Sequence, residues 1–369
     1  MTDRNTFFEL LQAGVWGRKA KLDSPPMSWQ TVFDMVVQQS VAGVTFDALQ
    51  SLPKDYMPEQ KLLFKWISNA CVIEKLNKQV NEAVSQLVSY LDVHSVPSRL
   101  MKGQGCASLY PNPLYRQSGD IDLFVGEEQY ERAKNLIRFC GINIEQESVY
   151  DAHFTWGKVK IEMHRFETIL YWPSLNRRFQ LICRQEEWRE PLTFEVNGQR
   201  VAMFNATFNA FYVFVHFYHH FLQAGVGLRQ VCDWMLIMKH YEHVINWKRL
   251  HDYVTAIGAE RAWNVFYGLT VEYLGVQLET VPEWMCEYKA ADVQFVLDDI
   301  LKVGNFGKFG KSMQKRSFGG GFMANMESFI ALFIRLLRVS KFGRREVLAY
   351  PLWKVFCDRS MFNRYKSKH

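Results

Sequence analysis

Two aspartates one residue apart, Asp120 and Asp122, have the side-chain type and spacing that best fit a chemical role in this sequence. They stand in residues 119–125, GDIDLFV, where polar and apolar residues alternate. That alternation predicts a strand on which both carboxylates project to one side, about 6–7 Å apart. Two such carboxylates repel each other unless water or a cation lies between them. Because Mg²⁺ is usually held by one or two carboxylates plus substrate phosphates, the pair predicts a site for Mg²⁺, with Mn²⁺ as the alternative ion.

A phosphate at such a site needs hydrogen-bond donors on its other side. Lys102, Gly103 and Gly105 precede the aspartates and stand at the start of a short predicted helix. A glycine turn that leads into a helix presents free backbone N–H groups, which bind anions. Arg116 can add a two-pronged phosphate contact, and Ser118 is a further candidate for nucleotide binding. The sequence therefore predicts that a phosphate-binding turn and a metal-binding strand form one site.

These residues resemble the motif of the DNA polymerase β-like nucleotidyltransferase superfamily, a glycine turn followed by Asp-x-Asp on a strand. The sequence is more closely similar to a bacterial family of uncharacterised nucleotidyltransferases. The similarity is carried by Met101-Lys102-Gly103, Leu109-Tyr110-Pro111, Arg116 and residues 119–125. It covers roughly residues 98–165 and, more loosely, the helical part to about residue 240. The sequence has Lys-Gly where the wider superfamily has Gly-Ser.

The resemblance implies a third carboxylate on a neighbouring strand. Residues 158–164, KVKIEMH, alternate as a strand does, and Glu162 occupies the implied acidic position. Asp120, Asp122 and Glu162 would then be the catalytic residues and hold two metal ions, while Glu162 helps to deprotonate an acceptor. His164 shares a face with Glu162 and is a candidate substrate-facing residue.

The reaction implied by the resemblance is transfer of an NMP from an NTP to a hydroxyl acceptor, with release of pyrophosphate. A small molecule, a protein or an RNA can be the acceptor, and the sequence does not distinguish them. The alternative is a catalytically silent nucleotide-binding or regulatory module with the same fold. The Lys-Gly departure favours this alternative, whereas the intact carboxylates favour the enzyme.

A later segment, residues 227–234, GLRQVCDW, resembles a helical motif of the same family. Arg229 and Asp233 stand four residues apart, so they either form a salt bridge along the helix or face the substrate. An aromatic segment just before it carries three histidines at helical spacing, His216, His219 and His220. Its aromatic neighbours favour a half-buried helix that faces the active-site cleft over a zinc site.

The elements that must position these residues alternate in type. Beginning near residue 97, the pattern predicts a strand (98–102), a helix (104–110), a strand (120–125), a helix (127–140), a strand (142–149) and then two strands around Gly157, with a hairpin at Asn197-Gly198. We therefore predict an α+β fold with a mixed-sheet nucleotidyltransferase core. The expected regions are an N-terminal helical region (1–96), the core (97–204) and a C-terminal helical region with a basic end (205–369). Helices are expected at 4–16, 29–42, 58–92, 206–222, 228–241, 246–256, 259–274, 290–302, 323–340 and 345–357, and a loop at 304–321.

The composition is that of a globular protein: 369 residues, 48% hydrophobic and 22% charged. No run of about 18 or more apolar residues predicts a transmembrane segment, and the first residues lack the apolar stretch of a signal peptide. We therefore expect a cytoplasmic protein. Seven cysteines without a CxxC pair predict neither a disulfide framework nor a cysteine zinc site.

The basic charge is concentrated at the C-terminal end. Residues 302–369 have a net charge of +12, and residues 1–301 have a net charge of −6, which together give the +6 of the whole chain. The apolar stripe of residues 323–340 is followed by Lys341, Arg344 and Arg345. An amphipathic helix beside cations can bind an anionic membrane surface or another acidic partner. The alternative is that the stripe packs on the helical region and the cations are solvated.

Overall fold

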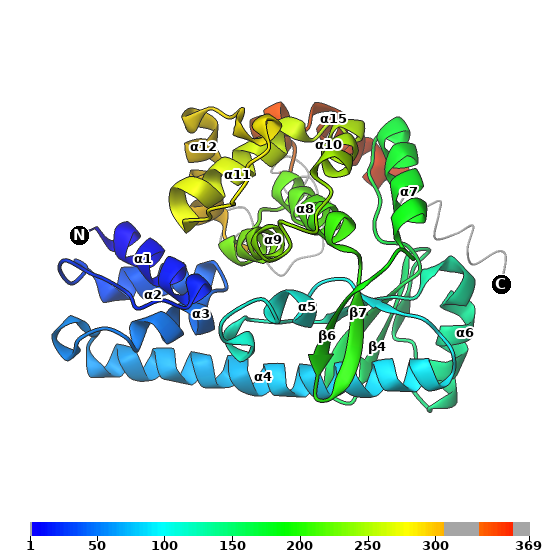
Figure 1. Ribbon diagram of the computed structural model, residues 1–369, viewed down its shortest axis with the longest axis horizontal. Coiled ribbons are helices and arrows are strands. Elements are labelled where there is room, and N and C mark those ends of the chain that lie inside the picture. Colours follow the sequence, from blue (N-terminus) through cyan, green and yellow to red (C-terminus); the bar gives the residue numbers. More distant parts are fainter. Residues whose placement is uncertain (1, 306–331, 357–369) are drawn as a thin grey trace, which may run out of the picture.

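The fold combines a mixed sheet with N-terminal and C-terminal helices, which confirms the predicted α+β fold (Figure 1). The structure is a computed structural model that describes residues 2–305 and 332–356. The boundaries at residues 97 and 204 stay a prediction.

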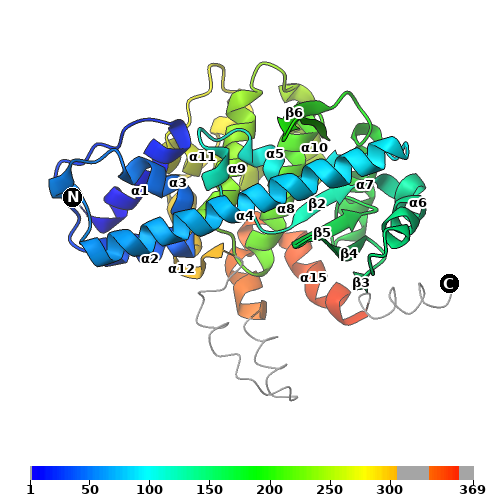
Figure 2. The same cartoon turned by 90° about the horizontal axis from the view of Figure 1, so that it is seen from below.

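The N-terminal helices rest on one long helix. They are α1 (Asp3–Trp16), α2 (Trp29–Gln38), α3 (Ala42–Leu49) and α4 (Gln60–Val93), with a short 3₁₀ turn, η1 (Lys54–Tyr56). The helix expected at 29–42 ends earlier, at Gln38, because Ser40 adopts a positive φ of 57°. The sequence reasoning missed α3. α4 crosses the molecule from the N-terminal helices to the sheet (Figure 2). It has no internal Gly or Pro to break it, as the sequence predicted.

The five-stranded sheet has the order β1-β2-β5-β4-β3. Its strands are β1 (Arg99–Leu100), β2 (Ile121–Phe124), β3 (Gln146–Glu147), β4 (Asp151–Trp156) and β5 (Val159–His164). β2 runs parallel to β5, with Asp122 opposite Glu162 and Phe124 opposite His164. The other pairs are antiparallel. The expected strand at 120–125 is therefore shorter, and Asp120 precedes it.

A separate two-stranded sheet, β6 (Leu192–Val196) and β7 (Gln199–Met203), packs against α4. Its predicted turn is confirmed, with positive φ at both Asn197 and Gly198. The helices of this central region are α5 (Gln104–Ala107), η2 (Pro113–Tyr115), α6 (Gly126–Phe139) and α7 (Pro173–Glu186). The sequence reasoning missed α7, although a proline at the first helical position, Pro173, is a start signal.

The C-terminal helices bury an aromatic core, in which Phe214, Trp234 and Trp263 lie in mutual ring contact. The elements are α8 (Ala206–Gln223), α9 (Leu228–His240), α10 (Trp247–Ala256), α11 (Glu260–Leu274), η3 (Glu283–Cys286), α12 (Ala290–Val303), a helix at 332–339, η5 (Ser340–Phe342) and α15 (Arg344–Phe356). No helix among residues 2–305 and 332–356 is long and apolar enough to cross a membrane.

The described part of the basic end is joined to the helical region. Arg335 lies 3.0 Å from the buried carboxylate of Asp299, and Lys341 lies 2.6 Å from Asp292. Leu336, Val339 and Phe342 are buried. These contacts favour the packing alternative for this part, although Arg344 and Arg345 stay exposed. The loop expected at 304–321 lies almost wholly outside the described residues, as does the first half of the helix expected at 323–340.

Candidate active site

Two neighbouring parallel strands bring Asp122, Glu162 and His164 together. Asp122 and Glu162 are paired in register between β2 and β5, and His164 follows two residues later on the same face of β5. One ligand atom from each residue lies within 4.8 Å of the others. Asp122 and His164 are buried, while Glu162 is half-buried. Glu162 and His164 thus share a face, as the alternation predicted, and Glu162 lies on a strand next to that of Asp122, as the resemblance implied.

Asp122 is held ionised by two neighbours. Its Oδ1 lies 3.0 Å from the Lys102 Nζ and 3.3 Å from the His164 Nε2. Burial alone raises the pKa of Asp122, but the Lys102 charge and the His164 hydrogen bond lower that pKa well below its usual range. Burial likewise lowers the pKa of His164, but the bond to Asp122 more than offsets this and raises it.

Glu162 has the opposite electrostatic character. Burial, followed by the negative charges of Asp122 and Asp120, raises its pKa to about 7. Its oxygens lie 3.6 Å from the His153 Nδ1 and 3.9 Å from the His164 Nε2. The carboxylates of Asp122 and Glu162 repel each other, and a divalent cation bound between them would remove this repulsion. Their oxygens are also the ligand type that Mg²⁺ and Mn²⁺ take, so this donor set fits the expected metal.

The raised pKa of Glu162 gives a testable pH dependence. Its contribution to stability is fully present below about pH 4.5 and is lost as the pH rises through about 7, because the folded protein retains a proton that the unfolded chain releases. We expect Glu162→Gln to raise the melting temperature over wild type at about pH 8 and to have little effect at about pH 5. Thermal unfolding in EDTA across this range is the measurement. Parallel pH profiles for the two proteins would contradict the prediction.

Asp120 lies outside this cluster. β2 begins at Ile121, so the alternation that was expected to align Asp120 with Asp122 stops before it, and the side chain is exposed. Its charge is nevertheless close enough to raise the pKa of Glu162. The backbone oxygen of Asp120 would lie 3.8 Å from a Cβ added at Gly103. Metal binding by Asp120 stays a prediction.

The Lys-Gly turn lies beside the carboxylates. Gly103 has a φ of 60°, which a side chain would strain. Gly105 is packed so closely against the Met203 side chain that a Cβ would clash, and this packing accounts for the glycine. The following helix, α5, has only four residues, so it is shorter than the helix expected at 104–110. A nucleotide contact at Gly103 or Gly105 stays a prediction.

Arg116 and Asp233 form a buried, two-pronged ion pair. The Arg116 Nη2 donates to the Asp233 Oδ2 at 2.6 Å, and its Nε donates to Oδ1 at 3.1 Å. The Tyr110 hydroxyl donates to the same Oδ1 at 2.8 Å. The Arg116 Nη1 donates to the Ser118 Oγ at 3.0 Å. Asp233 therefore pairs with Arg116, not with Arg229 along its helix, so the salt-bridge alternative is wrong. Phosphate binding by Arg116 and Ser118 stays a prediction.

Arg229 makes no ion pair with any residue that the structure describes. Its Nη1 donates to the Gln117 carbonyl at 2.5 Å, and its buried Nε has no hydrogen-bond partner. Burial and the charge of Arg116 lower its pKa. A half-buried guanidinium without a carboxylate, on the Asp120 side of the site, is well suited to receive an anion.

The histidines of α8 divide between two environments. The His216 Nε2 lies 3.0 Å from the Lys102 Nζ and 3.2 Å from the His220 Nε2. Burial and the Lys102 charge lower the pKa of His216 well below its usual range and that of His220 to about 3. His219 instead stacks on Tyr171. The three rings therefore do not form one zinc-binding face. α8 meets the site through His216, but the helix is almost wholly buried and not half-buried as expected.

Sequence reasoning missed His153 and the contact between Lys102 and His216. His153 stands opposite Glu162 in the β4–β5 pair, and its Nε2 lies 3.3 Å from Asp151. The alternation of β4 could have found it. No local pattern links Lys102 to His216, because 114 residues separate them.

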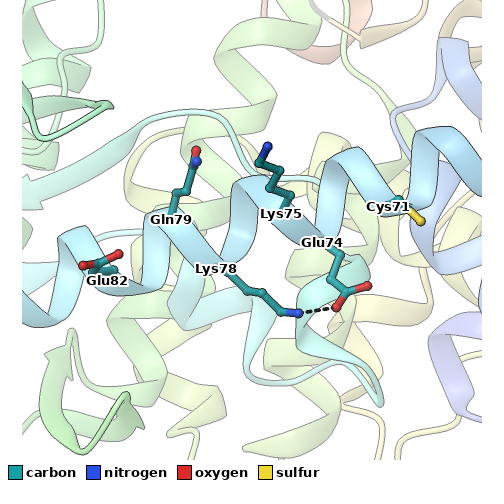
Figure 3. Close-up of a pocket in the computed structure, with 6 residues that line it drawn as sticks. All are labelled: Cys71, Glu74, Lys75, Lys78, Gln79 and Glu82. Atoms are coloured by element: carbon teal, nitrogen blue, oxygen red, sulfur yellow. Dashed lines mark hydrogen bonds and ion pairs between the residues drawn. The ribbon is translucent and has the colours of Figure 1, made fainter.

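A shallow pocket on the outer surface of α4 is separate from this site. Its lining comes entirely from one helix (Figure 3): Cys71, Glu74, Lys75, Lys78, Gln79 and Glu82. Lys78 and Glu74 form an ion pair within it. The pocket contains none of the carboxylates discussed above.

Comparisons with known proteins point to one family. The family described as uncharacterised nucleotidyltransferase matches residues 25–275. This range contains the carboxylate strands, the Lys-Gly turn and α8 to α11. No curated protein and no solved structure matches the chain.

Proposed function

The chain belongs to the uncharacterised nucleotidyltransferase family, and from this premise we propose that it transfers an NMP from an NTP to a hydroxyl acceptor and releases pyrophosphate. The observation that carries the proposal is the meeting of Asp122, Glu162 and His164 on two parallel strands, within 4.8 Å. Asp122 supplies a buried carboxylate, Glu162 supplies a carboxyl of raised pKa, and Lys102 and Arg229 supply two nearby cations. Such an arrangement can hold both a metal and a phosphate.

Asp122 and Glu162 would hold Mg²⁺ or Mn²⁺, with Asp120 as a third carboxylate. When bound, the metal lowers the pKa of the acceptor hydroxyl and neutralises charge on the departing pyrophosphate. His164 orients Asp122 through the 3.3 Å contact between Nε2 and Oδ1. Asp122 and Glu162 stand on strands, which hold them more rigidly than loops would.

Glu162 is the proposed general base. Its half-buried carboxylate lies beside Asp122 on the neighbouring strand, where it can accept the proton of a hydroxyl held at the same site. The acceptor oxygen forms a bond to the α-phosphorus of the NTP while its proton passes to Glu162. The bond from the α-phosphorus to the bridging oxygen breaks, and pyrophosphate leaves with the electron pair.

Lys102 and Arg229 are the proposed phosphate contacts. The Lys102 ammonium is partly exposed beside Asp122, and Arg229 has no described carboxylate partner. Both cations contribute to lowering the pKa of His220, so they approach the same part of α8. Their charges would offset the charge that builds on the phosphoryl oxygens in the transition state.

Replacing Arg229 tests this assignment. We expect Arg229→Met to weaken NTP binding by about 10- to 100-fold, because a hydrogen bond to a charged group contributes about 1.5–3 kcal/mol. NMP binding should change less, and the melting temperature should be nearly preserved, since no ion pair is broken. Calorimetry with Mg²⁺ and each nucleotide is the measurement. Arg132→Met is the control, because Arg132 also donates to a backbone carbonyl, that of His94. Equal losses for NTP and NMP would contradict the assignment.

The function itself is tested by a search for the transferred nucleotide. The full chain is incubated with Mg²⁺, each NTP and a cell extract, and mass spectrometry looks for an added NMP on small molecules, proteins and RNA. We expect one labelled class, with pyrophosphate released, and no label with Asp122→Asn. Binding of Mg²⁺-NTP without pyrophosphate release would instead favour the silent nucleotide-binding module. The engagement of Arg116 and Ser118 in internal hydrogen bonds is the observation that favours that second candidate.

A further inference from the structure

The Lys102 ammonium lies directly on the carboxylate that is proposed to bind metal. Its Nζ is 3.0 Å from the Asp122 Oδ1, the same oxygen that His164 contacts. On its other side, the Nζ lies 3.0 Å from the His216 Nε2. His216 is neutral because burial lowers its pKa, so its ring accepts a hydrogen bond from the ammonium. Lys102 is thereby held in place by one strand, β2, and one helix, α8.

In this position, Lys102 and a divalent cation would compete for the Asp122 carboxylate. A metal on Asp122 and Glu162 would stand a few ångströms from the ammonium, and like charges so close repel strongly in a partly buried site. The single negative charge of Asp122 would then be shared between Lys102 and the metal, so each cation weakens the binding of the other. The side chain keeps 18% of its surface exposed, so the ammonium has room to turn toward an incoming anion.

We propose that Lys102 is an internal counter-ion that competes with divalent metal for Asp122 and leaves it for a triphosphate, so that metal binding depends on nucleotide. The inference rests on the proposed function and adds an order of events to it. A triphosphate supplies the negative charge that the ammonium loses when it releases Asp122. Because coupling between two ligands is reciprocal, metal and triphosphate raise each other's affinity by the same factor. The site thus resists metal alone and accepts the metal–triphosphate complex.

The test compares metal alone with the metal–triphosphate complex. The full chain is freed of metal with EDTA, and binding of Mn²⁺ alone is followed by electron paramagnetic resonance. Binding of a preformed complex of Mn²⁺ with inorganic triphosphate is followed by calorimetry. We expect Lys102→Met to bind Mn²⁺ alone about tenfold or more tightly than wild type, and to bind the complex more weakly. Lys160→Met is the matched control, because Lys160 is an exposed lysine on β5 beside Glu162; its loss should change neither affinity by more than about twofold.

The outcomes separate the inference from the proposed function. If Lys102→Met is folded by circular dichroism and binds Mn²⁺ alone no more tightly than wild type, the counter-ion role is overturned, even when wild type binds the complex. If neither protein binds the complex, the proposed function falls, and the inference falls with it. Lys102→Gln, which also removes the charge, replaces the methionine variant should that variant not fold. A gain in Mn²⁺ affinity in Lys160→Met equal to that in Lys102→Met would reduce the effect to net charge and overturn the inference.

Discussion

Replacing Asp122 with asparagine is expected to weaken binding of Mg²⁺ with NTP by more than about 100-fold and to abolish nucleotidyl transfer. Loss of an outer-shell partner of a metal ligand already costs about 10- to 100-fold in metal affinity, and Asp122 is itself a proposed ligand. Asp122 is the only carboxylate residue in β2, and it is paired in register with Glu162 of β5. No other carboxylate on this strand can therefore replace it. Calorimetry with Mg²⁺-NTP and a pyrophosphate-release assay measure the two effects.

The same substitution should also lower stability. From the sequence alone, exchanging Asp120 and Asp122 for asparagine is expected to spare folding, because it removes two like charges from one strand face. The structure changes this expectation, since the ionised Asp122 is the counter-ion of Lys102 and of His164. Its low pKa means that it stabilises the fold above about pH 4 and that this contribution is lost as the pH falls further. We expect a loss of about 1–3 kcal/mol at neutral pH.

A matched control separates binding from stability. Asp292 is buried and is also bonded by cations, Lys341 at 2.6 Å and Arg261 at 2.7 Å, away from β2 and β5. Asp292→Asn should lower stability by a similar amount and leave Mg²⁺-NTP binding unchanged. If both variants lose affinity equally, unfolding explains the result. An Asp122→Asn protein that binds Mg²⁺-NTP as wild type does would refute the site.

The sequence predicted the strands of this site well because their evidence is local. Alternation in residues 119–125 and 158–164 requires only a period of two, and both segments form strands of one sheet. The face shared by Glu162 and His164 follows from the same period. The alternation does not mark where a strand begins, however, and Asp120 lies just outside β2 for this reason.

The partners of the charged residues could not be predicted, because they come from distant parts of the chain. Arg116 finds its carboxylate 117 residues away, whereas helical spacing suggested Arg229 as the partner of Asp233. Lys102 similarly contacts both a strand and α8. Sequence periodicity gives the face of an element but not what packs against that face, so the phosphate-binding assignment of Arg116 needs a direct test.

Replacing Arg116 with methionine is expected to lower the free energy of unfolding by about 3–5 kcal/mol, which is the usual cost of removing one partner of a buried ion pair. Arg116 and Asp233 are 4% and 3% exposed. Burial lowers the pKa of Arg116, but the charge and hydrogen bonds of Asp233 raise it above its usual value, so the guanidinium stays charged. Without it, Asp233 retains the Tyr110 hydroxyl as a partner and its negative charge is uncompensated. Urea denaturation at neutral pH measures the loss.

A double-mutant cycle and an exposed control decide what the loss means. Asp233→Leu should cost a similar amount, and the double variant should lose clearly less than the sum of the two, because neither charge is then left unpaired. Arg261→Met is the control, since Arg261 also pairs with a buried aspartate, Asp292, but is 52% exposed; it should cost less than about 1 kcal/mol. If Arg116 is instead a phosphate contact, as the sequence suggested, Arg116→Met will unfold almost as wild type does while NTP binding falls. The buried geometry leads us to expect the reverse, with Arg116 locking α9 to the segment that leads into β2 and so holding Asp122 in place.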